Sequence, residues 1–299
     1  MLYRLSKNTF VRQYGPFTYV LGRIRSYDQV FADAEVFFRW IGREPREKSE
    51  ILTNICGVYE GTDPAQIAAD FDEFFAPLVE EKIILCGDTP EALDAQEESF
   101  SYDVENPKTM DTHRIDPKEM TEGAIPQDVL ERYFAEHPTI FDLQIDVTQA
   151  CTERCVHCYI PEYNPVFLPL ADAKRVIDEF REQGGVGLSL SGGECMLHPD
   201  FDEIVRYART KDLIVAVLSN LTLCDEKRID FLADVQPQFV NVSLYSMDER
   251  EHDSITRLPG SWRRTMDAIL GCEKAGVAVR LAAPLLKENK GAFRALAAF

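Results

Sequence analysis

Residues 139–299 carry the pattern that most restricts how this chain can fold. Short apolar runs alternate there with stretches in which apolar residues recur every three or four positions. Such runs predict strands and such stretches predict helices. Strands that alternate with helices pair in parallel, because each helix returns the chain to the start of the next strand. We therefore expect an α/β domain whose sheet is bent into a barrel, with strands at residues 141–147, 186–190, 213–218, 239–244 and 277–286.

Polar and glycine-containing motifs follow the first four expected strands. In a barrel of parallel strands the functional loops lie at the carboxyl ends of the strands, so motifs from successive strands converge on one face. We expect this convergence for Cys151, Cys155 and Cys158 after strand one, Gly192, Gly193 and Glu194 after strand two, Ser219 and Asn220 at the end of strand three, and Ser243 in strand four.

The triple-cysteine loop predicts a metal centre. A structural zinc site uses four ligands in a closed tetrahedron, and this loop offers three. A disulfide would leave one cysteine unpaired. Iron–sulfur clusters favour thiolate ligands, and three cysteines on a [4Fe–4S] cluster leave one iron open to an outside ligand. The other five of the eight cysteines stand singly, and we expect them to be buried thiols.

The spacing C-x3-C-x2-C, on a loop after the first strand, resembles the radical S-adenosylmethionine (SAM) enzymes. The resemblance runs from about residue 141 to the end of the chain, and Gly-Gly-Glu stands in its expected place. It implies a [4Fe–4S] cluster on Cys151, Cys155 and Cys158, with SAM bound to the free iron. An electron passing from the cluster to SAM would then start hydrogen abstraction from a substrate, and no side chain is needed as a general base. Zinc or a purely structural cluster remains an alternative.

The same resemblance implies roles for residues around SAM. His157 and Tyr159 match positions beside the adenine, and Gly192 and Gly193 would let the backbone approach the methionyl part. Glu194 would accept from the SAM ammonium group. Ser243 matches a hydroxyl near the ribose and Arg257 a partner of the carboxylate, while Ser219 and Asn220 complete the cofactor-binding set. Ser219, Asn220 and Ser243 are alternatively ordinary strand residues, and the chain departs from its relatives at Leu221, where Gly is frequent, and at Tyr245, where Asp is frequent.

Residues 1–87 predict a small α+β unit like a winged helix. We expect strands within residues 2–32, with a turn at residues 14–17 and a third strand at 27–32. A helix capped by Asp33, a helix at residues 46–58 and a helix capped by Asp63 follow. Pro64 and Gln66 strengthen the last of these through a proline at the first position and a capping box. A strand at residues 82–87 closes the unit.

The third helix of this unit is acidic and would repel nucleic acid. In its order of elements, the unit resembles the peptide-recognition element of ribosomal-peptide maturases. That resemblance implies an extended leader peptide that adds as a strand to the small sheet and lies against the third helix. A domain that serves only packing or dimerisation is the alternative. The candidate peptide-binding residues are Tyr27, Gln29, Phe31, Phe71, Phe74 and Phe75.

Composition limits the partners and the cellular location that we expect for the chain. The 299 residues are 45% apolar and carry a formal net charge of −19, which argues against nucleic acid as a partner. Residues 88–122 are rich in acidic residues and lack apolar periodicity, so residues 88–138 are expected to form an acidic linker, with one helix at 127–137 leading into the domain 139–299. No signal peptide or membrane-spanning run is visible, and we expect a cytoplasmic protein.

These features together predict a maturase of the radical SAM type that acts on a ribosomally made precursor peptide. The product would be a thioether, a carbon–carbon crosslink or an epimerised residue, and an external donor would supply the electron. A small-molecule radical SAM enzyme and a non-catalytic, peptide-binding iron–sulfur protein are the alternatives. Because the sequence ends within an expected helix, we also expect a missing sixth strand, an exposed sheet edge and, as in SPASM-type maturases, a further cysteine-rich segment.

Overall fold

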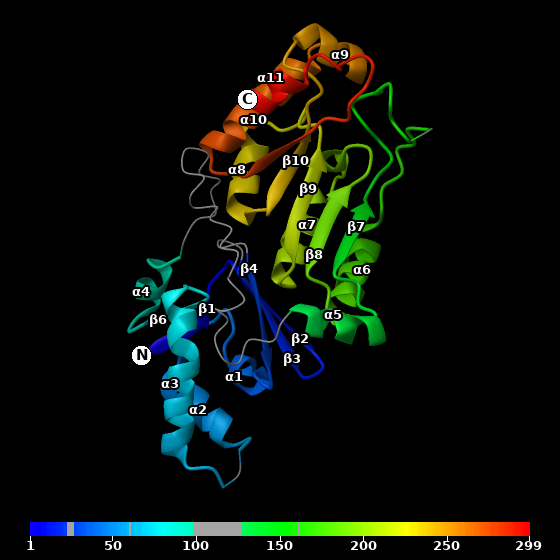
Figure 1. Ribbon diagram of the computed structural model, residues 1–299. Helices are drawn as coiled ribbons and strands as arrows, with labels where there is room; N and C mark the ends of the chain where they lie inside the picture. The colour runs from blue at the N-terminus through cyan, green and yellow to red at the C-terminus, as the bar shows by residue number, and fades with distance from the viewer. Residues whose placement is uncertain (23–26, 60, 98–126, 161) are drawn as a thin grey trace. The chain divides into compact units, whose positions relative to one another are not determined.

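The computed structural model describes residues 1–22, 27–59, 61–97, 127–160 and 162–299. The chain divides into two compact units, Met1–Pro138 and Thr139–Phe299 (Figure 1). None of the helices in the described ranges is long and apolar enough to cross a membrane.

The second unit is built on a parallel sheet, as the alternating pattern predicted. Its strands lie in the order β11-β10-β9-β8-β7, so each is hydrogen-bonded to its neighbour in sequence. Leu190 stands opposite Ile145 on one side and Val217 on the other, which fixes the register of the three strands. The strands are β7 (Asp142–Asp146), β8 (Gly187–Ser191), β9 (Ile214–Ser219), β10 (Phe239–Ser243) and β11 (Val279–Ala282).

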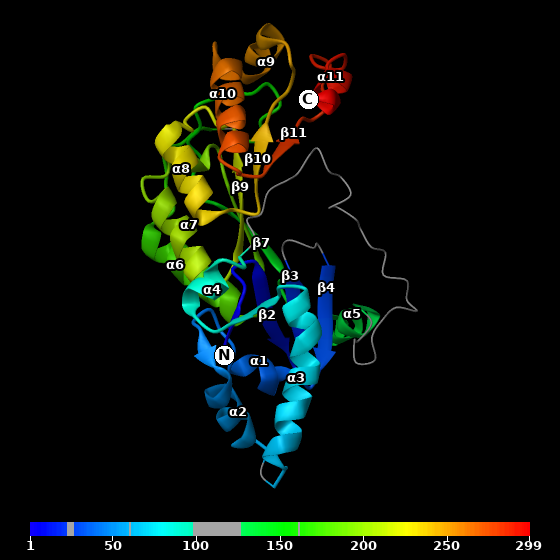
Figure 2. The same ribbon diagram turned by 90° about the vertical axis from the view of Figure 1, so that its left-hand side faces the viewer.

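Helices of the second unit pack on the sheet through apolar faces. In α6 the buried residues Ala173, Ile177 and Phe180 recur at helical spacing and belong to the core around β9. Figure 2 shows α6, α7, α8 and α10 on the same side of the sheet. The helices are α6 (Leu170–Glu182), α7 (Phe201–Thr210), α8 (Glu226–Val235), α9 (Glu249–Thr256), α10 (Ser261–Lys274) and α11 (Phe293–Ala298), with a short 3₁₀ helix at Cys195–Leu197.

Two details of the second unit differ from expectation. The helical stretch after residue 244 is divided into α9 and α10, because Arg257 and Gly260 both adopt left-handed backbone conformations with φ of 56° and 76°. Strand β11 ends at Ala282 instead of residue 286, and Pro284, which has no N–H to donate, stands two residues further on. Within the described part of this unit β11 pairs with β10 alone, and Leu281 on it is 37% exposed.

The first unit contains two antiparallel sheets instead of one winged-helix sheet. A turn at residues 7–8 separates β1 from β2, and Thr9 N donates to Ser6 O across it at 3.0 Å. Because of this turn, β1 belongs to a sheet of order β5-β1-β6, while β2, β3 and β4 form a separate antiparallel meander. The strands are β1 (Leu2–Leu5), β2 (Thr9–Tyr14), β3 (Phe17–Gly22), β4 (Tyr27–Ala32), β5 (Arg46–Glu47) and β6 (Ile84–Gly87).

All three helices predicted in the first unit are present, but their starts differ in part from the prediction. Asp63 caps α3 (Pro64–Glu80) by accepting from Ala65 N at 2.9 Å, but the Gln66 side chain donates to Asp70 and does not accept from Asp63 N as a capping box requires. Asp33 does not cap α1 (Glu35–Arg39), because its own φ is +56° and the capping position falls on Ala34. The helix expected at residues 46–58 is α2 (Lys48–Cys56), since its first two residues pair as β5.

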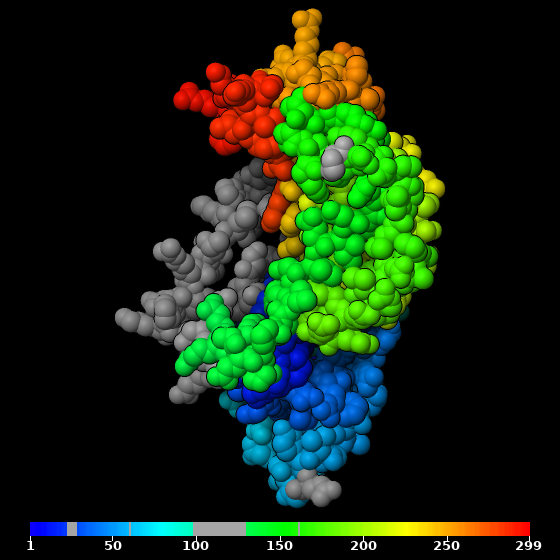
Figure 3. Space-filling view, turned by 90° about the vertical axis from the view of Figure 1, so that its right-hand side faces the viewer, coloured from blue at the N-terminus to red at the C-terminus, as the bar shows by residue number. Residues whose placement is uncertain are grey.

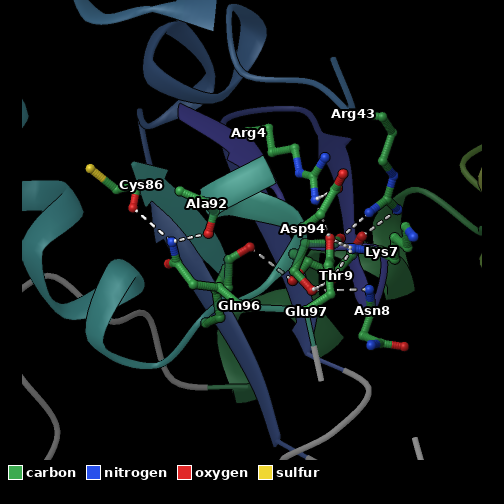
Figure 4. A network of polar contacts seen from close by, with 12 residues as sticks. Arg4, Lys7, Asn8, Thr9, Arg43, Cys86, Ala92, Asp94, Gln96 and Glu97 are labelled. Carbon is green, nitrogen blue, oxygen red and sulfur yellow. Dashed lines mark hydrogen bonds and ion pairs between the residues drawn. The ribbon is translucent and has the colours of Figure 1, made fainter. Parts of the chain in front are cut away.

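The start of the predicted acidic linker is part of the first unit. Helix α4 (Pro90–Asp94) begins at a Thr89 cap and buries Leu93 completely. Beyond it, Glu97 accepts from Arg4 at 3.1 Å and from the Ser6 hydroxyl at 2.9 Å (Figure 4). The linker prediction was wrong for residues 88–97. Composition alone does not show that one of these acidic residues, Glu97, pairs with the nearly buried Arg4. Residues 98–126 lie outside the described ranges.

Helix α5 (Gln127–Glu136) was predicted to lead into the second domain, and it belongs to the first unit instead. Tyr133 packs edge-on against Phe17 with ring centroids 5.6 Å apart, and Phe134 packs against Tyr14 at 4.9 Å. These aromatic contacts join α5 to the β2–β3 hairpin. They come from residues more than a hundred positions apart, which no local pattern indicates.

Candidate functional site

The loop with the three cysteines leaves the carboxyl end of β7 and is fixed by backbone hydrogen bonds. Arg154 N donates to Thr256 O and Val156 N to Ile255 O, both at 2.9 Å. Residues 255 and 256 lie in the last turn of α9, whose final carbonyl groups lack partners within the helix. The backbone N–H groups of the loop therefore satisfy two carbonyl groups at the C-terminal end of α9. Figure 3 shows this green loop region beside the orange α9 segment at one end of the second unit.

The two glycines after β8 are required by the cysteine loop itself. A Cβ on Gly192, whose φ is +129°, would stand 2.2 Å from Thr148 O, and one on Gly193 would stand 2.2 Å from Ala150 O. Gly193 N donates to Thr148 O and Glu194 N to Ala150 O, both at 2.8 Å. The close backbone approach that we expected toward the methionyl group of SAM is made in this structure toward the cysteine loop.

Glu194 crosslinks the ends of two strands from a fully buried position. Its carboxylate accepts from Met196 N at 3.0 Å, Asn220 N at 2.8 Å and the Ser219 hydroxyl at 2.8 and 3.0 Å. Burial raises the pKa of this carboxyl group, and the backbone donors oppose that shift. Protein donors thus reach both carboxylate oxygens, and acceptance from the SAM ammonium group stays a prediction.

Asn220 links the end of β9 to the cysteine loop. Its amide nitrogen donates to Thr152 Oγ1 at 3.0 Å and lies 3.7 Å from Cys151 Sγ. Its carbonyl oxygen accepts from Thr222 N at 3.0 Å, so the side chain is held at both ends. Ser219 and Asn220 therefore position the site through Glu194 and the cysteine loop, which goes beyond ending a strand.

Each of the three cysteine sulfurs faces a hydrogen-bond donor. Cys151 Sγ accepts from Glu153 N at 3.4 Å, Cys155 Sγ lies 3.8 Å from the Tyr245 hydroxyl, and Cys158 is hydrogen-bonded to the Tyr163 hydroxyl. Donors directed at sulfur stabilise thiolates that ligate a metal. Three half-buried thiols with such donors fit an iron–sulfur cluster.

Two of the three cysteine thiols, those of Cys151 and Cys155, have raised pKa values in the metal-free chain. Burial raises the pKa of Cys151 to about 11 and that of Cys155 well above its ordinary range. The Cys155 thiol donates to Glu153 Oε2 at 3.2 Å, and burial raises the pKa of Glu153 to about 7. Iron binding requires these thiol protons to leave, since the thiolate is the ligand.

The residues beside the cysteines do not form a compact site for a single ion. Within the described ranges, no three His, Cys, Asp or Glu side chains converge closely enough to hold one metal. A zinc ion needs all its ligands within about 2.3 Å of one point, whereas a cubane cluster bonds each thiolate to a different iron.

Tyr245 is a site residue that we noted in the sequence only as a departure from the usual Asp. Its ring lies edge-on to His157 with centroids 4.9 Å apart and stacks on His252 at 5.4 Å. Its hydroxyl contacts Cys155, and burial raises its pKa above the usual range. The only signal available from the sequence was that departure, because the contact joins residues ninety positions apart.

The remaining predicted residues lie around the same loop. His157 and Tyr159 are exposed beside the cysteines, and the Tyr159 hydroxyl donates to Asp146 at 3.3 Å. Ser243 ends β10, where its hydroxyl meets that of Tyr245. Arg257 is exposed one residue after α9, next to the carbonyl groups that bind the loop. The structure thus brings the predicted set to one edge of the sheet, while their contacts with SAM stay predictions.

Two of the six candidate peptide-binding residues are core residues. Phe71 is 0% and Phe75 1% exposed, and Phe71 packs edge-on against Tyr3 of β1 at 5.3 Å. These positions lie one turn apart on α3 and face the sheet. Their rings are unavailable to a bound peptide in this structure, so that part of the prediction was wrong.

The other candidates lie where β4 meets α3. The partly exposed rings of Phe31 and Phe74 pack 5.3 Å apart, and Gln29 donates to Glu81 at 2.8 Å. The side chain of Tyr27 lies outside the described part of the chain. Strand β4 pairs with β3, and in the described ranges it has no second neighbour.

The five single cysteines are divided between core and half-buried positions. The buried members are Cys195, Cys224 and Cys272, as expected, and the half-buried members are Cys56 and Cys86. Cys224 and Cys272 are hydrogen-bonded to each other, so two thiols that stand apart in the sequence are neighbours in space.

A parallel α/β sheet with a three-thiol loop at its carboxyl edge defines an iron–sulfur protein of the class in which the cluster keeps one iron open. The family model of the Radical SAM superfamily matches residues 145–299, and the chain belongs to that superfamily. The family uses a [4Fe–4S] cluster and S-adenosylmethionine.

Curated relatives cover the second unit of the chain. The antilisterial bacteriocin subtilosin biosynthesis protein AlbA of Bacillus subtilis is 30% identical over 158 residues, which are 52% of this chain and 35% of AlbA. The Fe-coproporphyrin III synthase of Methanosarcina barkeri is 29% identical over 147 residues, which are 48% of this chain and 37% of that protein. The chain thus spans little more than a third of the length of these relatives.

A solved structure is similar over nearly the whole chain. Streptococcus suis SuiB bound to its precursor peptide SuiA matches 98% of this chain and 60% of SuiB, with a TM-score of 0.56 and 14% identity. At this identity the likeness establishes the fold alone.

Proposed function

We propose that the chain is the SAM-cleaving part of an enzyme that modifies a ribosomally made precursor peptide. The observation that carries the proposal is the edge of β4, which lies beside α3 and has no second strand neighbour in the described ranges. An unpaired edge next to a helix can accept an extended peptide as an added strand. AlbA, which serves bacteriocin biosynthesis, and SuiB, which was solved with a precursor peptide, support the same substrate class.

The residues of the chain would divide the work as follows. Cys151, Cys155 and Cys158 would hold the cluster, and cluster and SAM supply the radical chemistry when they are bound. Glu194 and Asn220 hold the glycine loop and the cysteine loop in register. We further propose the cytoplasm as its location, an external electron donor, and a sheet bent into a partial barrel. Which bond forms in the peptide is left open by these residues.

A leader peptide encoded beside this chain tests the proposal. Its binding to the intact chain is measured by fluorescence anisotropy, together with a peptide of identical sequence whose alternate backbone nitrogens carry methyl groups. Strand addition predicts that N-methylation abolishes binding, because main-chain N–H donors supply the affinity. Equal binding of both peptides would contradict addition to β4.

A second candidate is a small-molecule enzyme, favoured by the similarity to Fe-coproporphyrin III synthase. The reconstituted protein is reduced with SAM, and release of 5′-deoxyadenosine is measured with peptide or with an iron porphyrin. Stimulation by the peptide supports the maturase, and stimulation by the porphyrin supports the alternative. If no 5′-deoxyadenosine is released with any reductant, the enzyme hypotheses fail and a non-catalytic, peptide-binding iron–sulfur protein is the hypothesis that is left.

A further inference from the structure

The Tyr245 side chain is buried beside the cysteine loop and has contacts on its ring and its backbone. It is 4% exposed, and its ring contacts the rings of His157 and His252. Its backbone N donates to His252 Nδ1 at 3.2 Å, and its backbone O accepts from Asn289 at 3.0 Å. A phenol packed against two imidazole rings and hydrogen-bonded at both backbone groups presents its hydroxyl in one place, 3.8 Å from Cys155 Sγ.

The chemistry of a loaded site fixes the direction of this contact. A cysteine that ligates iron is a thiolate and has no proton to give. The hydrogen bond that the Cys155 thiol now donates to Glu153 Oε2 is then lost, because the thiolate has no proton. The Tyr245 hydroxyl keeps its proton and becomes the donor to Cys155, in an environment where water is largely excluded. Hydrogen bonds gain strength in such surroundings.

We propose that Tyr245 is a positioning residue of the cluster, whose hydroxyl donates to the Cys155 thiolate and makes the cluster easier to reduce. A donor at sulfur stabilises the reduced state more than the oxidised one, because the reduced cluster carries one more negative charge. One electron enters the cluster from an external electron donor, and no bond is formed or broken at the tyrosine. The inference depends on the cluster alone and stands whether the substrate is a peptide or a small molecule.

Tyr163 provides an internal comparison on the same loop. Its hydroxyl is hydrogen-bonded to Cys158, but its side chain is only half-buried, with the Arg154 guanidinium 3.8 Å from its ring centroid. Water competes for this hydroxyl, and the positive charge beside it remains when the hydroxyl is removed. Loss of the Tyr163 hydroxyl should therefore change the cluster less than loss of the Tyr245 hydroxyl.

The test compares the variants Y245F, Y163F and Y207F after anaerobic reconstitution of the full chain. The midpoint potential of the cluster is measured without SAM by an EPR-monitored redox titration. We expect Y245F to lower the ratio of reduced to oxidised cluster at a fixed potential about threefold, which is about 28 mV for a one-electron couple. Y163F should give a smaller shift. Y207F should give none, since the Tyr207 hydroxyl donates to Asp178 on the surface of the helices.

Iron per chain and far-UV circular dichroism show whether each variant folds and loads. If Y245F fails to load, 3-fluorotyrosine at position 245 replaces it; its hydroxyl is a stronger donor, so the midpoint potential should rise. An unchanged potential in a fully loaded Y245F, or a shift equal to that of Y207F, would overturn the proposal. A fluorotyrosine protein with a potential at or below that of the unmodified chain would overturn it as well.

Discussion

Substitution of Gly193 by alanine should lower the free energy of unfolding of the second unit and leave that of the first unit unchanged. The added Cβ would stand 2.2 Å from the backbone oxygen of Ala150, whereas real Cβ contacts are not closer than 3.0 Å, so one loop must move by the difference, 0.8 Å. That movement stretches the hydrogen bonds from Gly193 N to Thr148 O and from Glu194 N to Ala150 O, both 2.8 Å, beyond useful length.

The expected cost follows from those contacts. Two lost backbone hydrogen bonds contribute about 1 kcal/mol each, and overpacking against backbone atoms adds about 1 to 3 kcal/mol. The free energy of unfolding of the second unit should therefore fall by about 3 to 5 kcal/mol, a large part of the stability of a typical domain. The same displacement moves the cysteine loop, so the variant should also bind less iron.

The assay uses the two tryptophans of the chain, Trp40 in the first unit and Trp262 in α10. In a W40F background, urea unfolding followed by Trp262 fluorescence reports the second unit. Gly291→Ala is the matched control, because a Cβ there meets no atom within 4 Å and no positive φ is involved. Equal unfolding midpoints for G193A and G291A, with equal iron per chain, would refute the reasoning.

Three further outcomes are expected. E194Q should destabilise the second unit by about 2 kcal/mol, because an amide N–H₂ would face backbone N–H donors; unchanged stability with lost SAM binding would instead favour the ammonium role. Burial lowers the pKa of His252 from 6.5 to about 4, with Asp253 opposing the shift, so the unfolded chain takes up a proton first as the pH falls. Stability should therefore decline between pH 6.5 and 4 by up to about 1.4 kcal/mol per pH unit, and H252N should remove that part of the slope in a pH series of urea titrations. E97Q should lower the stability of the first unit by about 2 kcal/mol, since the Arg4 and Glu97 side chains are each 10% exposed; Trp40 fluorescence in a W262F background measures it, and an unchanged midpoint would contradict the ion-pair argument.

Local pattern was enough to predict the parallel α/β unit and the cysteine loop. The strands of the second unit are buried runs such as β9, and its helices carry apolar residues at helical spacing. The three cysteines stand within eight residues of each other, so their proximity on one loop is a property of the chain itself. The Asp63 cap was predicted for the same reason, because its partner Ala65 is two residues away.

Tertiary structure decided what each site residue contacts. Glu194 is held by Ser219 and Asn220, Cys155 by Tyr245, and Glu97 by Arg4, at separations of 25 and 26, 90 and 93 residues. Burial and hydrogen-bond partners at such separations depend on how strands are ordered and which loops meet, and this information is absent from any short window of sequence. The sequence by itself determined that three thiolates would be presented at the end of a strand. Only the folded chain determined that the glycines after β8 make room for the cysteine loop and that a buried phenol faces one of its sulfurs.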